Sequence, residues 1–395
     1  MKPIRIRRIP AVLIGLVLLA GGLLKLNDPV GAGLVVAEYL KWMHLGFLRG
    51  LAEGIGVVFA LLEAGTGAAL LTGVWRKAVS IIATVLLGFF TLLTLALLIS
   101  NPDMDCGCFG EAVHLTHLQS FLKNVILLAL AAAAFIPYRN LGEAPPRKYV
   151  SFGIIAASLL VALLWSYLRL PSVDFTEFAP NAELAASQDN DYQQFDGYKA
   201  YYVYEKGGQT GSFTLDRLPD STWTFVRVDT LLRNEFPMEE PVVALPFTDE
   251  AGAYRDELAV LGRVLVISVY NPSGIGGRKA ARIRETVEAA EDKGYTPLVL
   301  AAGHPSDFAG SGFEDKVYTA DYKTLITLNR SNGGAVWIDD GSIIRKWPAC
   351  NLPDGKELGR FAQRDPLEMT VKYLTRGRIR AQGYCLYLIA LLIFI

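Results

Sequence analysis

The sequence predicts an α-helical membrane bundle joined to a soluble α/β domain. The 395 residues are 52% hydrophobic, and the apolar residues are concentrated between positions 9 and 170, where long runs carry almost no charge. Beyond position 170 charges return and apolar runs shorten. There, strand-like segments alternate with helix-like ones, which is typical of an α/β domain.

Five apolar runs in the first part are long enough to cross a bilayer, which takes ~20 helical residues. They cover about 10–26, 51–73, 78–100, 119–137 and 149–168. The first run has an alternative interpretation as a cleaved signal peptide, because basic residues precede it and small residues occur at 20–22. It extends to Leu26, which favours a membrane helix. A shorter run at 380–395 is a candidate sixth span, ~24 Å long if helical.

The basic residues of the loops indicate the orientation in the membrane. The amino-terminal tail, the turn at 75–77 and the loop at 138–148 carry four, two and three of them, whereas 101–118 carries none. We therefore expect a bacterial cytoplasmic (inner) membrane protein whose 101–118 loop, and whose chain after the fifth helix, face the periplasm.

Charge also bears on the partners. The net charge is −1, and no basic stripe interleaved with aromatic residues occurs, so nucleic acid is not an expected partner. The expected partners are periplasmic proteins and the lipid bilayer.

These patterns divide the chain into six segments. The transmembrane domain covers 1–140, a cytoplasmic linker covers 141–148, and a fifth transmembrane helix covers 149–170. A periplasmic segment with a β-hairpin covers 171–240, the α/β domain covers 241–376, and the candidate last membrane helix covers 378–395.

Shorter elements are expected within these segments. A moderately apolar helix at 30–49 should lie on the outer face. Alternation of apolar and polar residues predicts a hairpin of 201–205 with 212–215 and a further strand at 221–228. In the α/β domain we expect strands at 263–270, 296–302 and 316–319, helices at about 276–293 and 321–329, and a closing hairpin at 334–347.

Lys25, Glu53 and Glu63 are charged residues inside the apolar runs. Carboxylates at membrane depth are costly and usually have a partner or handle protons. Lys25, near the outer end of the first helix, is expected to pair with Glu53. For Glu63, a packing carboxylate and a functional one are both open interpretations. Glycines along the same helix predict close helix packing.

Two of the four cysteines, Cys106 and Cys108, lie in the loop before the fourth apolar run, with one glycine between them. Gly107 permits the tight bend that brings their sulfurs together. A disulfide in so small a ring departs from relaxed geometry and is easily reduced. We therefore expect a redox pair that cycles between dithiol and disulfide.

The surroundings of these thiols have two opposing effects on their pKa. Acidic neighbours at 103, 105 and 111 raise it, whereas the dipole of the next helix lowers it. Thr116 and Gln119 form a capping-box pattern at the start of that helix. The sequence does not show which of these two effects on the thiol pKa is larger.

Two other interpretations of the loop remain open. The pair can be a static disulfide that only pins the loop. His114 and His117 follow closely, so two sulfurs and two imidazoles provide the ligands of a tetrahedral zinc site, although the cysteine spacing is narrower than usual and no metal is expected. Either histidine could also accept a thiol proton. Cys350 and Cys385 lack sequence partners and are expected to be structural, with Cys350 a conceivable exchange partner.

The amino-terminal part resembles the DoxX-like membrane proteins, and within them the MauE type, named for methylamine utilisation. The resemblance covers roughly 5–140 and rests on the run from Gly15 to Pro29, on Leu62-Glu63 and above all on Cys106-Gly107-Cys108-Phe109-Gly110. It implies a four-helix bundle comparable to vitamin K epoxide reductase and a role in disulfide formation during periplasmic protein maturation. It also implies that Cys106 and Cys108 are the redox pair, that Lys25 and Glu63 are family-like polar positions, and that a membrane quinone can accept the electrons.

Residues 240–350 resemble a thioredoxin-like domain in the order of their elements. The turn after its first core strand, Asn271-Pro272-Ser273-Gly274, has no cysteine where the redox Cys-x-x-Cys belongs. Asn332-Gly333-Gly334 stands where thioredoxins place a cis-proline. The resemblance implies a degenerate domain that binds or positions something. The function is thus either a thiol-disulfide oxidoreductase or its accessory, or a non-enzymatic envelope scaffold with a structural disulfide.

Overall fold

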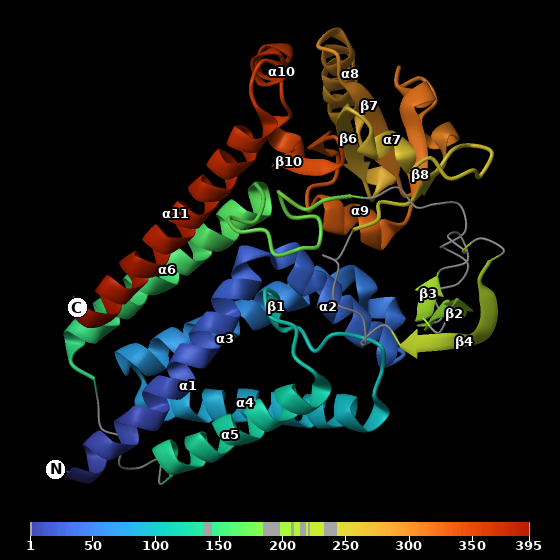
Figure 1. Cartoon of the computed structure of the whole chain (residues 1–395). Helices are drawn as coiled ribbons and strands as arrows, with labels where there is room; N and C mark the ends of the chain where they lie inside the picture. The colour runs from blue at the N-terminus through green and yellow to red at the C-terminus, as the bar shows by residue number, and fades with distance from the viewer. Residues whose placement is uncertain are drawn as a thin grey trace.

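The structure is a computed structural model that describes residues 2–136, 144–184, 198–206, 209–213, 219, 222–232 and 243–394. Long helices form a bundle in the amino-terminal part, and an α/β domain lies at one end of it (Figure 1). The predicted fold class is confirmed.

Five helices in the described ranges are long and apolar enough to cross a membrane, so the chain is a multi-pass membrane protein. They are α1 (Lys2–Asn27), α3 (Ala52–Thr72), α4 (Arg76–Ser100), α5 (His117–Phe135) and α6 (Pro146–Leu168). Local signals set their ends. The helix α3 stops at Gly73, which has a φ of 81°, and α5 begins at the predicted capping box of Thr116 and Gln119.

The helix expected at 30–49 is divided into two pieces. The helix α2 (Pro29–Trp42) begins at Asp28, whose carboxylate accepts a hydrogen bond from Gly31 N at 2.9 Å. A 3₁₀-helix, η1 (Gly46–Leu51), leads into α3. His44 separates them because its φ of 60° does not fit a right-handed helix.

The helices α1 and α3 pack with their backbones in contact. A Cβ at Gly22 would collide with the backbone of Ala64, and one at Gly67 would collide with the backbone of Leu19. Small residues at a helix crossing allow this approach, as the sequence predicted. The contacts run in opposite directions along the two helices, so α1 and α3 are antiparallel.

The α/β domain has a six-stranded mixed sheet in the order β10-β9-β6-β7-β8-β5. Its strands are β5 (Phe247–Thr248), β6 (Arg263–Val269), β7 (Thr296–Ala301), β8 (Val317–Ala320), β9 (Gly334–Asp339) and β10 (Ser342–Trp347). Its helices are α7 (Glu257–Val260), α8 (Gly277–Asp292), α9 (Tyr322–Leu328) and α10 (Gly355–Ala362). The strands β6, β7 and β8 are parallel, and β9 pairs antiparallel with β6 and β10.

Every strand and helix predicted between 263 and 347 is present. The elements β5, α7 and α10 were not predicted. A separate antiparallel sheet contains β2 (Tyr198–Lys206), β3 (Gln209–Phe213) and β4 (Thr224–Leu232), in the order β3-β2-β4. The predicted hairpin and third strand are confirmed there, except that 214–215 and 221 lie outside the described residues.

The last helix, α11 (Pro366–Phe394), runs alongside α6 (Figure 1). Ser151 Oγ donates a hydrogen bond to Leu391 O at 2.9 Å, and Leu388 is buried against α6 and the bundle. The segment expected as a sixth span is thus the second half of one longer helix. It is not among the five apolar helices of the described residues, and Arg378 and Arg380 lie where its apolar run begins.

Candidate functional site

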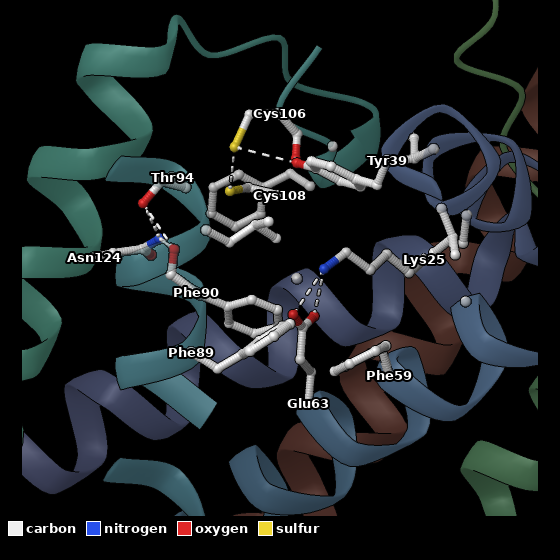
Figure 2. Close-up of a pocket in the computed structure, with 18 of the residues that line it drawn as sticks. Lys25, Tyr39, Phe59, Glu63, Phe89, Phe90, Thr94, Cys106, Cys108 and Asn124 are labelled. Carbon is white, nitrogen blue, oxygen red and sulfur yellow. Dashed lines mark hydrogen bonds and ion pairs between the residues drawn. The ribbon is translucent and has the colours of Figure 1, made fainter. Parts of the chain in front are cut away.

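The two loop cysteines face each other at the mouth of the bundle. Their Sγ atoms are 3.2 Å apart, as two thiols sharing a hydrogen bond (Figure 2). Gly107 between them has a φ of 60°, and a Cβ there would collide with Val35 of α2. Glycine is therefore required both by the backbone conformation and by the close approach of α2.

Tyr39 of α2 holds the loop from the side. Its Oη donates a hydrogen bond to Cys106 O at 2.6 Å and lies 4.0 Å from Cys106 Sγ. Burial raises the pKa of the Tyr39 phenol, so this group stays a donor at neutral pH. The hydrogen bond fixes the position of Cys106, which is itself buried.

The two thiols differ in acidity. The hydrogen bond from the Cys106 thiol lowers the pKa of Cys108, and the nearby Lys123 and Lys25 ammonium groups add to this, against the opposing effect of burial. The same hydrogen bond, together with burial, raises the pKa of Cys106. Cys108 is therefore the more acidic thiol of the pair.

Two of the three acidic neighbours, Asp105 and Glu111, are paired with other groups. Asp105 Oδ2 lies 3.0 Å from His114 Nδ1 on the exposed side of the loop, and Glu111 pairs with Arg330 of the α/β domain. The sequence did not show whether the pKa of the thiols is raised or lowered. In the structure, the hydrogen bond between the two thiols and two nearby lysines lower the pKa of Cys108.

A cavity of about 240 Å³ lies beneath the cysteines, inside the bundle. Its walls are mostly apolar. Phe59 of α3 stacks on Phe89 of α4 with ring centroids 5.6 Å apart, and Phe90 lies beside them. Figure 2 shows Cys106 and Cys108 on one side of this space and the Lys25–Glu63 pair on the other.

Lys25 pairs with Glu63, and the expected Lys25–Glu53 pair is wrong. Lys25 Nζ lies 2.7 and 2.8 Å from the two carboxylate oxygens of Glu63, and both side chains are largely buried. The antiparallel contact of α1 with α3 explains the choice, because Gly22 opposite Ala64 brings Lys25 close to Glu63. Glu53 is exposed at the start of α3, where its backbone packs against Gly33 of α2.

A polar link closes the cavity between α4 and α5. Asn124 Nδ2 donates hydrogen bonds to Thr94 Oγ1 and Phe90 O, each at 3.2 Å. Lys123, the next residue, places its ammonium 4.8 Å from the centroid of the Phe109 ring. Asn124 thus ties α5 to α4, and Lys123 places α5 against the cysteine loop.

The remaining candidates lie apart from the sulfurs. His117 Nε2 lies 3.1 Å from Pro102 O, and His114 faces Asp105 as described. Cys350 is exposed and its thiol donates to Leu168 O at 3.2 Å, and Cys385 is exposed on α11. In the described part of the chain, no three His, Cys, Asp or Glu side chains converge as a metal site.

At the sheet end where the sequence resembles thioredoxin, two asparagines are joined. Asn332 Oδ1 accepts a hydrogen bond from Asn271 N at 3.0 Å, and Asn332 Nδ2 donates one to Asn271 O at 2.8 Å. This link closes the turn at 271–274.

Two residues of the site were missed in the sequence. Lys123 is a single cation inside an apolar run, a signal that would have been usable because such residues are rarely placed in a membrane helix without a role. Tyr39 carried no signal, because its contact is to a backbone oxygen distant in sequence.

Two protein-family models match separate regions of the chain. Residues 5–137 match the protein family described as Methylamine utilisation protein MauE, which confirms the resemblance of this region. Residues 198–234 match a Domain of unknown function (DUF8463). The chain is similar to Protein TlpB of Flavobacterium psychrophilum, with 27% identity over 142 residues, which is 35% of this chain and 38% of that protein. The chain thus matches well under half the length of this relative. No solved structure matches, and the α/β domain has no match to a thioredoxin family.

Proposed function

We propose that this protein is a membrane thiol-disulfide oxidoreductase, or an accessory to one, that acts in the maturation of periplasmic proteins. The observation that carries the proposal is the paired state of the cysteines. Two thiols 3.2 Å apart, with one acidified by the other, have the arrangement that disulfide exchange requires.

The exchange step balances within the cysteine pair and its partner. A thiolate of the partner attacks one sulfur of the Cys106–Cys108 disulfide and forms a mixed disulfide. Cys108 has the lower pKa and is the better leaving group, so attack is favoured at Cys106. A second partner thiolate then displaces Cys106. The partner gains a disulfide, and the two electrons remain on Cys106 and Cys108. Of the two protons that the partner dithiol gives up, one stays on the cysteine pair and the other passes to solvent.

The cavity is a suitable site for the acceptor that reoxidises the pair, which we propose to be a membrane quinone. A quinone supplies the capacity to take up two electrons and two protons. Phe59, Phe89 and Phe90 offer flat apolar faces to a ring, and Lys25 Nζ can donate a hydrogen bond to a ring oxygen. Cys108 lines the same cavity. The cavity therefore offers a quinone apolar ring faces, a hydrogen-bond donor and a neighbouring thiol.

The proposed reaction requires the cysteines to face the oxidising side of the membrane. The distribution of basic residues supports this orientation. Arg8 donates hydrogen bonds to Leu70 O and Leu71 O, at the end of the bundle that also carries Arg76 and Lys77. The amino terminus lies at this end, and the α/β domain lies at the other (Figure 1).

We further infer that the α/β domain is a degenerate thioredoxin-like domain. The strand order β10-β9-β6-β7, with β6 and β7 parallel and the β9–β10 hairpin antiparallel, supports this assignment. The Asn271–Asn332 link in place of redox cysteines favours a binding or positioning role for it. The same observation favours the second candidate function, a non-enzymatic scaffold in which the cysteine pair only pins its loop.

Thiol trapping in intact cells separates the two functions. Cells that express the wild type, Cys106→Ser or Cys108→Ser are quenched with acid and alkylated. Cys108→Ser removes the thiol that can release a partner from Cys106, so we expect mixed disulfides with periplasmic proteins to accumulate on Cys106 in this variant, and fewer on Cys108 in Cys106→Ser. A wild-type pair in one invariant oxidation state, with no partner trapped by either variant, would support the scaffold.

A further inference from the structure

One arginine of the α/β domain reaches into the membrane bundle beside the cysteine loop. Arg330 follows α9, and its side chain is only 5% exposed. Its Nε and Nη2 lie 2.9 Å from Asp28 Oδ2, and Nη2 also lies 3.0 Å from Glu111 Oε1. Its Nη1 donates to Ile326 O at 3.1 Å, which ties the guanidinium to its own helix.

The two carboxylates belong to the elements that hold the cysteines. Asp28 caps the start of α2, and α2 carries the Tyr39 that binds Cys106 O. Glu111 ends the short strand β1 (Cys108–Glu111), which begins at Cys108 itself. One guanidinium therefore links α2 and β1, the two elements that hold the cysteines. Its planar, forked N–H donors suit two carboxylates better than an ammonium would.

Two neighbouring contacts hold α9 against the bundle. Lys323 of α9 pairs with Glu38 of α2 at 2.7 Å, and the Arg49 guanidinium lies 5.2 Å from the centroid of the Tyr322 ring. Lys323 is 72% exposed, so its ion pair contributes little energy. Arg330 is the buried contact of this group, and breaking it removes the ion-pair partner of the largely buried Asp28 and of the partly exposed Glu111.

We propose that Arg330 is a positioning residue for the Cys106–Cys108 pair, so that the α/β domain sets the geometry of a redox centre that it does not itself contain. This inference rests on the proposed function. When the ion pairs of Arg330 with Asp28 and Glu111 are lost, β1 and α2 are free to separate, and the hydrogen bond between the two sulfurs weakens. The dithiol form is then destabilised, and the equilibrium moves toward the disulfide.

The other groups facing Cys108 stay in place in this test. They are Lys25 of α1, Tyr39 of α2, Glu63 of α3, Lys123 of α5 and Cys106 of the same loop. None of them contacts Arg330 among the contacts of the described residues, so substitution at 330 acts through the loop.

The measurement is the dithiol–disulfide equilibrium of the purified full-length protein in glutathione buffers, read by alkylation and mass spectrometry. For Arg330→Gln we expect a shift toward the disulfide of at least about threefold. Arg330→Lys should recover part of it, because an ammonium can pair with one carboxylate. Lys323→Gln on the same helix is the matched control and should stay within about twofold of the wild type.

A second variant separates positioning from a simple effect of charge. Arg330→Gln removes a positive charge near the thiolate and Glu111→Gln removes a negative one, so an effect of charge alone would shift the equilibrium in opposite directions. Loss of the Arg330–Glu111 ion pair, by contrast, shifts the equilibrium of both variants toward the disulfide. Opposite shifts, or values within about twofold of the wild type for both variants, overturn the inference.

The outcomes also separate this inference from the function on which it rests. A wild-type pair that does not interconvert in glutathione buffers refutes the redox function. A wild-type pair that interconverts while both variants match it refutes only the role of Arg330. If Arg330→Gln fails to fold, Glu111→Gln decides, because that side chain is 30% exposed and can lose its charge without a buried defect.

Discussion

At the scale of single residues, the site depends on one proton shared between two sulfurs. The two Sγ atoms lie 3.2 Å apart and share a hydrogen bond, and the lysines near Cys108 lower its pKa and so favour its thiolate. The thiolate is present above the lowered pKa of Cys108 and is lost as the pH falls through it.

Lys123→Met should therefore slow the alkylation of Cys108. Removing the ammonium raises the pKa of Cys108 from about 5, so the pH profile of the reaction moves to higher pH. The rate at pH 5 falls by roughly threefold, whereas the rate at pH 7, where the thiol is ionised in both proteins, changes little. The rate is measured with iodoacetamide on purified protein, with the exposed Cys350 as internal reference. Lys77→Met, at the far end of α4, is the control. An unchanged profile for Lys123→Met would show that this lysine does not act on the thiolate.

The Lys25–Glu63 pair gives a second prediction. Either Lys25→Met or Glu63→Gln leaves one buried polar or charged group without its partner, at a cost of about 3–5 kcal/mol in the free energy of unfolding for the charged case. The double variant should recover much of the loss. Unfolding in detergent micelles, followed by circular dichroism, tests this. Additive losses would mean that the two side chains do not depend on each other.

The residues that the sequence identified are those whose type conflicts with their surroundings. Cys106 and Cys108 stood out as a pair in a short loop, and Lys25 and Glu63 as charges in apolar runs. The wrong partner for Lys25 has a physical cause. Depth in the membrane can be estimated from position in a run, but the residue opposite on the neighbouring helix depends on where the two backbones touch.

At the scale of elements, the close contact of α1 with α3 sets that register. Gly67→Ala should lower the free energy of unfolding by roughly 1–3 kcal/mol, because the new Cβ meets the backbone of Leu19, which cannot yield without separating the helices. Gly65→Ala in the same helix is the matched control, since nothing lies within 4 Å of a Cβ there.

Gly65→Ala should be neutral or slightly stabilising, because alanine favours a helix more than glycine does. Both variants are compared by the same unfolding measurement. Equal effects of the two substitutions would contradict the close α1–α3 contact.

The elements of the sheet domain were predictable where they were long and regular. The strands β6 and β7 are continuous apolar runs, and the β9–β10 hairpin has a turn at Asp339-Asp340-Gly341 with φ of 44° at Asp340 and 81° at Gly341. The strand β5 has two residues and is too short to show alternation. The helix at 30–49 was predicted as one piece because its break at His44 carries no glycine or proline.

At the scale of the whole molecule, the α/β domain is seated on α2 through α9. Zero-length carbodiimide coupling should join Lys323 to Glu38, whose charged atoms are 2.7 Å apart. Peptides are identified by mass spectrometry. Lys316–Glu291, an ion pair at 2.9 Å within the α/β domain, is the positive control. Coupling of the control pair without any Lys323–Glu38 product would contradict this docking.

This docking could not be predicted from the sequence. Arg330, Asp28 and Glu111 are ordinary charged residues in loops or at helix ends, and they are far apart along the chain. Only the relative position of the two domains makes them one cluster.

The central claim is that Cys106 and Cys108 pass electrons from protein dithiols toward a membrane acceptor. The most direct measurement uses the purified protein in lipid nanodiscs with a short-chain quinone and a reduced dithiol protein, and records quinol by absorbance. We expect about one quinol per disulfide formed, and no reaction with Cys106→Ser or Cys108→Ser. Quinol formation that is the same in the wild type and in both variants, or none with any of them while the wild-type pair stays oxidised, would contradict the account.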